Sequence, residues 1–326
     1  MSQPTSPTQE NVFPRIVAHA KEYGFVFPSS EIYDGLQAVY DYGQHGVELK
    51  NNLKRLWWQA MTQGNDESTG GAVVGLDAAI FMHPTTWKAS GHVDSFSDPM
   101  IDNRDSNKRY RADNLIEDRA EQLRAGGDAA RADALVTKMN ALLAAEDLTG
   151  VRDLIVAENI TCAQSGTANW TDVRQFNLMF DTQVGSVADD SDKIYLRPET
   201  AQGIFVNFLN VQKTGRMKVP FGIAQIGKAF RNEIVARQFI FRMREFEQME
   251  MQFFVRPGEE MAAYERWKEV RLRFHRALGL PADRLRYHEH EKLAHYANAA
   301  VDIEYAFPFG FKEIEGIHSR TDFDLR

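Results

Sequence analysis

Charged and aromatic side chains alternate along residues 219–255 as they would on two adjacent strands. The first expected strand ends in Arg231-Asn232-Glu233, and the second is expected over residues 241–255. Strand side chains point to alternate faces. One face of the second strand is therefore apolar and suits the protein core (Met249, Met251, Phe253 and Val255), whereas the other carries a ring, an amide and a carboxylate (Phe246, Gln248 and Glu250).

The polar face has the side chains that nucleotide recognition needs. A guanidinium such as that of Arg231 grips phosphate in a fork geometry. A ring such as that of Phe246 stacks on a purine, and a carboxylate such as that of Glu233 accepts a hydrogen bond from an exocyclic amine. The alternative is an edge hairpin whose charges form a ladder of salt bridges, since buried charges need a partner or a ligand.

Glu199 is a further carboxylate, placed where a strand is expected to turn into a helix. Residues 194–197 predict a short strand, and Pro198 and Thr200 are typical of a helix start. One interpretation is that Glu199 complements the positive end of that helix. The other interpretation is that the carboxylate binds the ammonium group of a small amino acid.

Composition indicates a globular chain with one or two domains. The chain has 326 residues, of which 26% are charged and 43% hydrophobic, and a net charge of -8 argues against a general nucleic-acid binder. The single cysteine, Cys162, excludes an internal disulfide framework and a cysteine-based zinc site. No signal pattern or membrane span is apparent, so we expect a cytoplasmic protein. Residues 1–12 are polar and are expected to be a disordered lead.

Residues 47–61 predict a helix, because apolar residues recur every three or four positions. Trp57 and Trp58 are adjacent, so this helix has apolar surface on more than one side. Either a subunit interface or a buried core helix explains such a surface.

Several sequence segments together resemble one enzyme family. The arrangement F-R-N-E, a loop, and R-x-x-x-F-x-x-x-E resembles motif 2 of class II aminoacyl-tRNA synthetases. The segments REFEQMEMQFF, L-R-P-E-T-A-Q-G-I-F and H-P-x-x-W-x-x-S-G-H are similar to those of glycyl-tRNA synthetases. The resemblance implies an α+β fold with an antiparallel sheet flanked by helices, a catalytic domain at residues 13–112 and 166–326, and a helical insertion at 113–165.

The resemblance implies an ATP-dependent, AMP-forming ligase that activates glycine to glycyl-adenylate and transfers it to tRNA(Gly) in protein synthesis. ATP with Mg²⁺, glycine and tRNA(Gly) are then the partners, and no DNA or membrane is involved. Two alternatives stay open: a synthetase-like tRNA-binding or scaffold protein without catalysis, and a ligase that loads an amino acid on another carrier.

For ATP, the resemblance implies that Arg231 is catalytic and holds the α-phosphate, and that Phe246 and Glu233 hold adenine. Arg242 then approaches the terminal phosphates and Glu315 carries Mg²⁺. The full set of residues implied for ATP is Arg231, Asn232, Glu233, Phe241, Arg242, Met243, Arg244, Glu245, Phe246, Glu315 and Gly316.

For glycine, the resemblance implies that Glu199 and Glu250 hold the ammonium group and that Arg111 holds the carboxylate. Two carboxylates that crowd the pocket would also exclude larger side chains. The full set implied for glycine is Arg111, Glu199, Phe246, Glu247, Gln248, Met249 and Glu250.

The segment at residues 36–62 resembles motif 1, which builds the dimer interface of the family, so we expect a homodimer. Gln44 stands where the family has a proline, and the turn loses its fixed φ. The family often carries a Cys-x-x-Cys pair where this chain has Asn103 and Ser106, so we expect no zinc.

The expected insertion is rich in alanine, glutamate and leucine and predicts two or three helices, broken at residues 125–127 and near 148–150. It could contact the tRNA acceptor arm or act as a stabilising flap. The resemblance runs from about residue 11 to 326 and stops before motif 3 and the anticodon-binding domain. We therefore expect the catalytic domain to be incomplete at its C-terminus and to perform the chemistry poorly at this length.

Overall fold

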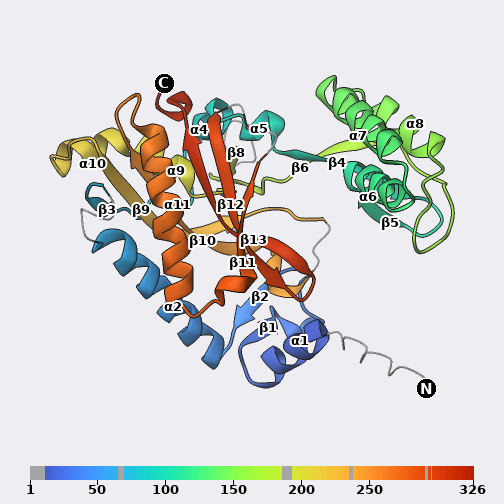
Figure 1. The fold of residues 1–326 in the computed structure, drawn as a ribbon. Coiled ribbons are helices and arrows are strands. Elements are labelled where there is room, and N and C mark those ends of the chain that lie inside the picture. The colour runs from blue at the N-terminus through green and yellow to red at the C-terminus, as the bar shows by residue number, and fades with distance from the viewer. Residues whose placement is uncertain (1–11, 65–69, 186–192, 235–237, 291–292, 295) are drawn as a thin grey trace, which may run out of the picture. The chain divides into compact units, whose positions relative to one another are not determined.

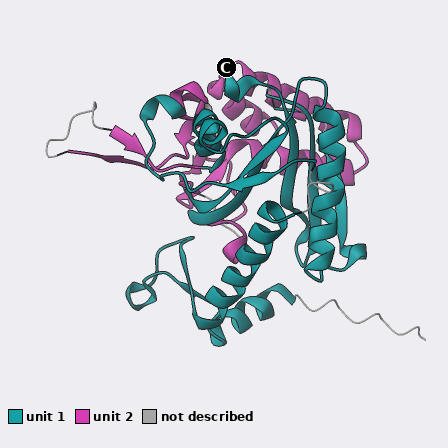
Figure 2. Ribbon diagram, turned by 90° about the vertical axis from the view of Figure 1, so that its left-hand side faces the viewer, with its two compact units in different colours: residues 1–86, 199–230, 245–326 teal, residues 87–198, 231–244 magenta. Residues whose placement is uncertain are grey.

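The computed structural model of the chain describes residues 12–64, 70–185, 193–234, 238–290, 293–294 and 296–326 (Figure 1). Of the predicted disordered lead, residues 1–11 lie outside these ranges, and Val12 begins the first helix. The chain forms two compact units, which Figure 2 colours separately. Unit 1 comprises Met1–Thr86, Glu199–Phe230 and Glu245–Arg326, and unit 2 comprises Trp87–Pro198 and Arg231–Arg244.

Unit 1 consists of mainly antiparallel sheets and the helices that pack on them. Its helices are α1 (Val12–Glu22), α2 (Gln44–Thr62), α9 (Ala201–Val206), α10 (Phe208–Thr214) and α11 (Glu260–Ala277), and α4 (Pro84–Ala89) crosses into unit 2. Its strands are β1 (Val26–Pro28), β2 (Tyr40–Tyr42), β3 (Val73–Gly75), β9 (Phe221–Phe230), β10 (Glu245–Phe254), β11 (Leu285–Glu289), β12 (Ala297–Phe307) and β13 (Gly310–Arg320).

The predicted hairpin is present as strands β9 and β10, which pair antiparallel from Phe221↔Phe254 to Phe230↔Glu245. Strand β3 adds to β9 in parallel, and β11, β12 and β13 form a second, antiparallel sheet. The expected strand limits need correction, because β9 ends at Phe230 and β10 begins only at Glu245. Arg231 and Glu233 therefore lie in the loop and not at the end of the first strand.

Helix α2 settles the two interpretations of the tandem tryptophans. Trp57 is 2% exposed and packs in a core with Val73, Ala224 and Trp267. Trp58 packs against the same core, where a Cβ on Gly75 would lie 2.4 Å from its ring. The tryptophans therefore belong to the core, because the bare glycine lets the indole approach the strand backbone.

Met249, Met251 and Phe253 of β10 pack against this core, as the alternation predicts. Helix α11 packs on the core through Trp267 and also buries two ionisable residues, Arg271 and His275. An apolar pattern could not reveal those two positions.

Unit 2 has a small sheet and the predicted helical insertion. Its helices are α5 (His92–Ser95), α6 (Ala112–Ala125), α7 (Ala129–Ala144) and α8 (Leu148–Ala157). Its strands are β4 (Ser97–Asn103), β5 (Lys108–Arg111), β6 (Arg174–Asn177), β7 (Asp181–Gln183) and β8 (Lys193–Tyr195), with the order β5-β4-β6 and a separate β7-β8 pair. Helices α6, α7 and α8 pack on each other around Ile116, Met139 and Ile155.

The limits of the insertion helices follow local capping. Helix α6 ends at the predicted break at residues 125–127. The break expected near residues 148–150 lies at residues 145–147, and Leu148-Thr149-Gly150 is the first turn of α8. Asp147 starts that helix by accepting a hydrogen bond from the Gly150 N–H at 2.8 Å. Among the described residues, no helix has the length and apolar character that crossing a membrane requires.

Candidate active site

In unit 2, the loop between β9 and β10 is fixed at both ends by backbone hydrogen bonds. The N–H of Arg231 donates to the carbonyl of Arg244 at 2.8 Å, and the N–H of Asn232 donates to Leu178 at 2.7 Å. The Nε of Arg231 donates to the carbonyl of Pro198 at 3.0 Å, and its guanidinium lies 5.4 Å from the centre of the Phe96 ring. This arrangement orients the Arg231 side chain before any ligand is present.

Glu233, the carboxylate of this loop, is buried, at 8% exposure. Nη1 of Arg242 lies 3.5 Å from its Oε2, and Nε of Arg244 donates to its backbone carbonyl at 2.9 Å. Phe241 closes a short turn that precedes these arginines. The structure therefore brings together the loop residues that the sequence assigned to ATP.

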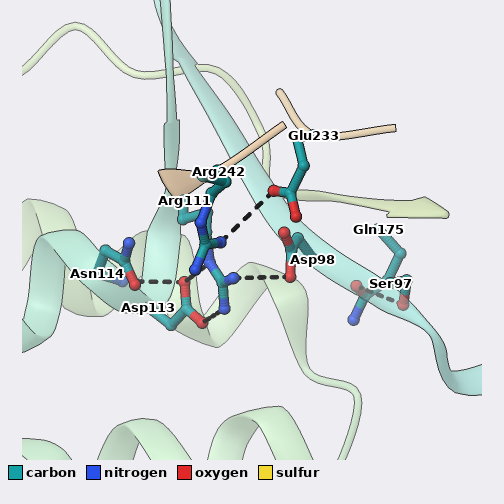
Figure 3. Close-up of polar contacts among 8 residues, drawn as sticks. All are labelled: Ser97, Asp98, Arg111, Asp113, Asn114, Gln175, Glu233 and Arg242. Carbon is teal, nitrogen blue, oxygen red and sulfur yellow. Dashed lines mark hydrogen bonds and ion pairs between the residues drawn. The ribbon is translucent and has the colours of Figure 1, made fainter. Parts of the chain in front are cut away.

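Arg111 lies between two carboxylates in the same unit (Figure 3). Its Nη2 and Nε bind Asp113 at 2.6 and 3.1 Å, and its Nη1 binds Asp98 at 3.0 Å. These contacts raise the pKa of Arg111, chiefly through the hydrogen bond to Asp113. A ligand carboxylate would have to share this guanidinium with Asp98 and Asp113.

Asp98 is a residue of this cluster that sequence reasoning missed. Burial raises the pKa of its carboxyl, and the like charges of Asp113 and Glu233 raise it further, whereas Arg111 and Arg242 lower it. Figure 3 shows Asp98 on β4 facing the Glu233 carboxylate. The segment S-F-S-D-P carries no motif that would have marked it.

In unit 1, Glu250 forms the centre of a polar cluster on β10. Thr200 donates its hydroxyl to Oε2 of Glu250 in a short hydrogen bond, and Gln252 donates to Oε1 at 2.8 Å. Burial raises the pKa of the Glu250 carboxyl, and the nearby charge of Glu199 raises it further. Hydrogen bonds and Arg320 oppose these effects without reversing them. Such a site favours a bound cation, because a cation would relieve the repulsion between the two carboxylates.

The turn that carries Glu199 is held by two glutamines. Gln248 accepts from the backbone N–H of Thr200 at 3.0 Å. Gln225, which is 0% exposed, donates to the Thr200 carbonyl at 2.5 Å and accepts from the Ala78 N–H at 3.1 Å. Thr200 and Gln225 were not predicted as site residues, because only the folded hairpin brings them to this turn.

Glu247 and Met249 lie on the other face of β10. Glu247 forms ion pairs with Lys50 and Lys54 of α2 at 2.8 and 3.0 Å, and Met249 packs in the core. Strand alternation therefore argues against side-chain contacts from these two residues to an amino acid on the Glu250 face. Glu245 is paired with Lys228 across the hairpin, and Phe246, opposite Ala229, is half-buried.

Glu315 does not fit the predicted role as a Mg²⁺ ligand. Its two carboxylate oxygens bind Nε of Arg271 at 2.6 Å and Nε2 of His275 at 2.7 Å, both on α11. These partners lower the pKa of the carboxyl even though burial raises it. Gly316 lies on the opposite face of β13, where a Cβ would contact Glu313, His318 and Asp302. Oε1 of Glu313 lies on the Gly316 side of the strand, 3.3 Å from that Cβ position.

Two family models match the chain. The glycyl-tRNA synthetase insertion domain 1 matches residues 98–134 and 124–178. The tRNA synthetase class II core domain (G, H, P, S and T) matches residues 180–324.

Curated relatives are similar along nearly the whole chain. A glycine–tRNA ligase of Chlorobaculum tepidum is 55% identical over 313 residues, which is 95% of this chain and 66% of that protein. One of Macrococcus caseolyticus is 52% identical over 313 residues, covering 95% of this chain and 64% of that protein. The chain thus spans somewhat less than two thirds of the length of these relatives.

Solved structures share the fold at low sequence identity. A Giardia lamblia prolyl-tRNA synthetase in complex with prolyl-adenylate has a TM-score of 0.56 at 12% identity, and the match covers 97% of this chain and 47% of that one. A cytoplasmic serine–tRNA ligase of Naegleria fowleri in complex with AMP has the same TM-score and identity, with coverages of 94% and 48%. Together with the family models and the relatives, this likeness shows that the chain has the class II synthetase fold and belongs to the glycyl-tRNA synthetase family.

Proposed function

We propose that the chain carries the catalytic chemistry of an ATP-dependent glycine–tRNA ligase. Glycine attacks the α-phosphate of ATP through its carboxylate, glycyl-adenylate forms and pyrophosphate leaves, and the glycyl group is then transferred to tRNA(Gly). The observation that carries this proposal is the cluster around Glu250. A carboxylate that is hydrogen bonded by neutral donors and lies near a second carboxylate is suited to the ammonium group of an amino acid.

The unit 1 residues are assigned to recognition. Glu199 and Glu250 bind the ammonium group, and Phe246 stacks on adenine. Thr200 donates its hydroxyl to the Glu250 carboxylate, and Gln248 accepts from the Thr200 backbone N–H in the turn that carries Glu199. Because glycine has no side chain, its selection rests on these charges and on limited space.

The unit 2 residues are assigned to phosphate and carboxylate groups. Arg231 binds the α-phosphate, Arg242 the terminal phosphates, and Arg111 the glycine carboxylate. Glu233 accepts a hydrogen bond from the adenine amine. No covalent enzyme intermediate is needed, so these residues act by positioning the reactants and neutralising charge.

Mg²⁺ would enter with the phosphates of ATP and neutralise their charge. Within the described part of the chain, no group of three or more His, Cys, Asp or Glu side chains could hold a metal ion. Mg²⁺ typically binds one or two carboxylates together with substrate phosphates, so a preformed protein site is not required. No step is assigned to a Mg²⁺ ligand of this chain.

The experiment is glycine-dependent exchange between ATP and pyrophosphate, with the Chlorobaculum tepidum relative as positive control. Exchange with glycine and none with alanine or serine would support the proposal. Charging of tRNA(Gly) then separates a tRNA ligase from a ligase that uses another carrier. Tight tRNA binding without exchange would instead favour a scaffold protein.

We also propose that the chain forms a homodimer through the region that resembles motif 1. Helix α2 leaves Leu49, Leu53 and Leu56 exposed by 62%, 37% and 46%, and the loop before it leaves Leu36 exposed by 57%. Helix α2 buries its tryptophans but leaves these leucines exposed to solvent in the single chain. Such an exposed apolar surface is typical of a subunit interface.

Light scattering at micromolar concentration tests the dimer. The parent chain should have twice the mass of one chain, and Leu49→Glu with Leu53→Glu should give a monomer. Leu209→Glu on α10, where the leucine is 56% exposed, is the matched control and should stay dimeric. A monomeric parent would contradict the proposal.

A further inference from the structure

Cys162, the single cysteine of the chain, lies at the centre of a cluster of polar side chains in unit 2. It is 0% exposed. Its Sγ is 3.3 Å from Oγ of Ser106 and 3.2 Å from the hydroxyl of Tyr110. Burial raises the pKa of this thiol, but hydrogen bonds from Ser106, Ser165 and Tyr110 outweigh the effect and lower it to about 6. The sulfur is thus surrounded by hydroxyl groups and by the backbone N–H of Ser165.

Two turns of identical spacing supply this cluster. Asn103 and Ser106 are three residues apart in one turn, and Cys162 and Ser165 are three apart in the other. The residue after each turn has a positive φ, 54° at Asn107 and 72° at Gly166. The backbone N–H of each serine donates to the side chain three residues before it, at 3.1 Å for Asn103 Oδ1, and likewise for the Cys162 sulfur.

The side chains of the two turns also meet. Oγ of Ser165 donates to Oδ1 of Asn103 at 2.9 Å, and Oγ of Ser106 contacts Oδ1 of Asn103 at 3.1 Å. Asn103 is itself 0% exposed and donates through Nδ2 to the carbonyl of Thr167 at 3.2 Å. The four positions 103, 106, 162 and 165 therefore converge on one point, where Asn103 and Cys162 are buried and the two serines are half-buried.

Paired x-x spacings that converge in this way are typical of a tetrahedral zinc site, in which all four positions are cysteine or histidine. Here the donors are one thiol, two hydroxyls and one amide. Zn²⁺ prefers sulfur and imidazole nitrogen, and a neutral amide with two hydroxyls does not replace three thiolates. The residues present therefore do not fit the zinc ion that the family's Cys-x-x-Cys pair implies.

We propose that these four positions keep the backbone geometry of a tetrahedral metal centre and that their hydrogen bonds perform the fastening that a metal ion would otherwise provide. The first turn leads through β5 into α6, and the second follows α8. The cluster joins the points where the chain enters and leaves the three-helix insertion. Two further hydrogen bonds stabilise the same junction. Thr167 donates to the Asp105 carboxylate at 2.5 Å, and Asn169 donates to it at 2.8 Å.

The sharpest experiment restores the ligands. The triple variant Asn103→Cys/Ser106→Cys/Ser165→Cys, with native Cys162, should bind one Co²⁺ per chain with the visible absorption of a tetrahedral thiolate site. Zn²⁺ should displace the Co²⁺. The matched control Asn103→Cys/Asp105→Cys/Ser165→Cys has the same number of thiols but one in the wrong place, and its Co²⁺ affinity should be at least tenfold weaker. A folded triple variant that binds no better than this control would overturn the proposed geometry.

The parent chain and single variants give a second test that does not depend on the triple variant folding. Purified parent protein should contain less than 0.1 zinc per chain by elemental analysis, an expected fraction set by the single thiol. Its thermal midpoint should not change with a chelator. Asn103→Ala should lower that midpoint by several degrees, whereas Asn140→Ala, at an exposed position of α7 outside the cluster, should change it little. Stoichiometric zinc, or a midpoint that falls with chelator, would overturn the hydrogen-bonded fastening.

Discussion

Two carboxylates of unit 1, Glu250 on β10 and Glu315 on β13, are both largely removed from solvent, but their partners differ in charge. Glu315 binds two cationic side chains of α11, with contacts of 2.6 Å to Arg271 and 2.7 Å to His275. Glu250 is hydrogen bonded by the neutral groups of Thr200 and Gln252. Burial raises the pKa of both carboxyls. The partners of Glu315 outweigh this effect and lower its pKa, whereas the pKa of Glu250 stays raised.

The difference separates a structural carboxylate from one that is suited to a ligand. Breaking a buried ion pair is costly because the remaining charge loses its partner. A carboxylate with a raised pKa and a like-charged neighbour gains most when a cation from outside binds. A sequence motif alone does not distinguish the two cases, and the resemblance placed both residues at the site.

The largest expected effect is on stability. Glu315→Gln should lower the free energy of unfolding by about 3 kcal/mol, since it leaves Arg271, which is 3% exposed, without its anion. Urea denaturation followed by circular dichroism measures this loss. The control is Glu313→Gln at an exposed position of the same strand, which should change stability by less than about 0.5 kcal/mol. Equal losses in both variants would remove the contrast with Glu250.

Glu250→Gln and Glu199→Gln should act on glycine rather than on stability. Each removes a charge from the ammonium site but keeps the size of the side chain. Charge-assisted hydrogen bonds contribute about 1.5–3 kcal/mol, so the glycine requirement should rise roughly ten- to a hundredfold. Exchange kinetics with glycine and ATP varied separately should show little change for ATP.

Glu247→Gln is the matched control for these variants, because Glu247 lies on the other face of β10 and binds lysines of α2. It should leave the glycine requirement near that of the parent. If Glu199→Gln leaves glycine dependence untouched, Glu199 only complements the start of the helix and the amino-acid pocket is misplaced.

Arg231→Ala should give the reverse pattern. Its side chain is assigned to the α-phosphate, so ATP use should be impaired first, by about tenfold or more for one lost charge-assisted contact. The same exchange kinetics measure it. A variant in which glycine dependence changes more than ATP dependence would contradict the assignment of Arg231 to ATP and of Glu199 and Glu250 to glycine.

The smallest expected effect is the pH dependence of stability. The lowered pKa of Glu315 contributes stability that is present above its unfolded value of 4.5 and is lost as pH falls through its folded pKa. The raised pKa of Glu250 does the opposite: stability is full below 4.5 and decreases as pH rises towards its folded pKa.

Denaturation of the parent and both variants between pH 3 and pH 8 tests these signs. The loss caused by Glu315→Gln should shrink at acid pH, because the native carboxyl is then also uncharged. Glu250→Gln should be as stable as the parent, or more stable, near pH 7, and should lose that advantage below about pH 4.5. Parallel curves for both variants would contradict the comparison.

The local order of the chain was readable from the sequence wherever one segment decided the outcome. Period-2 alternation predicted which side of β10 enters the core, and Met249, Met251 and Phe253 do so. Recurring apolar residues predicted α2, and composition predicted the helices of the insertion. The family motifs, which are long and specific, predicted membership of the glycyl-tRNA synthetase family.

Tertiary structure decided what each charged side chain contacts. The sequence could not show that Trp57 and Trp58 point to the core and leave the leucines outside, because both faces of α2 are apolar. It could not assign Glu315 to α11, since Arg271 and His275 interrupt an otherwise apolar pattern 40 or more residues away. Nor could it show that Asn103, Ser106, Cys162 and Ser165 meet, because the three helices of the insertion separate the two turns in sequence. Pattern and propensity are local properties, whereas the partner of a buried charge or hydrogen bond is fixed only when distant segments pack.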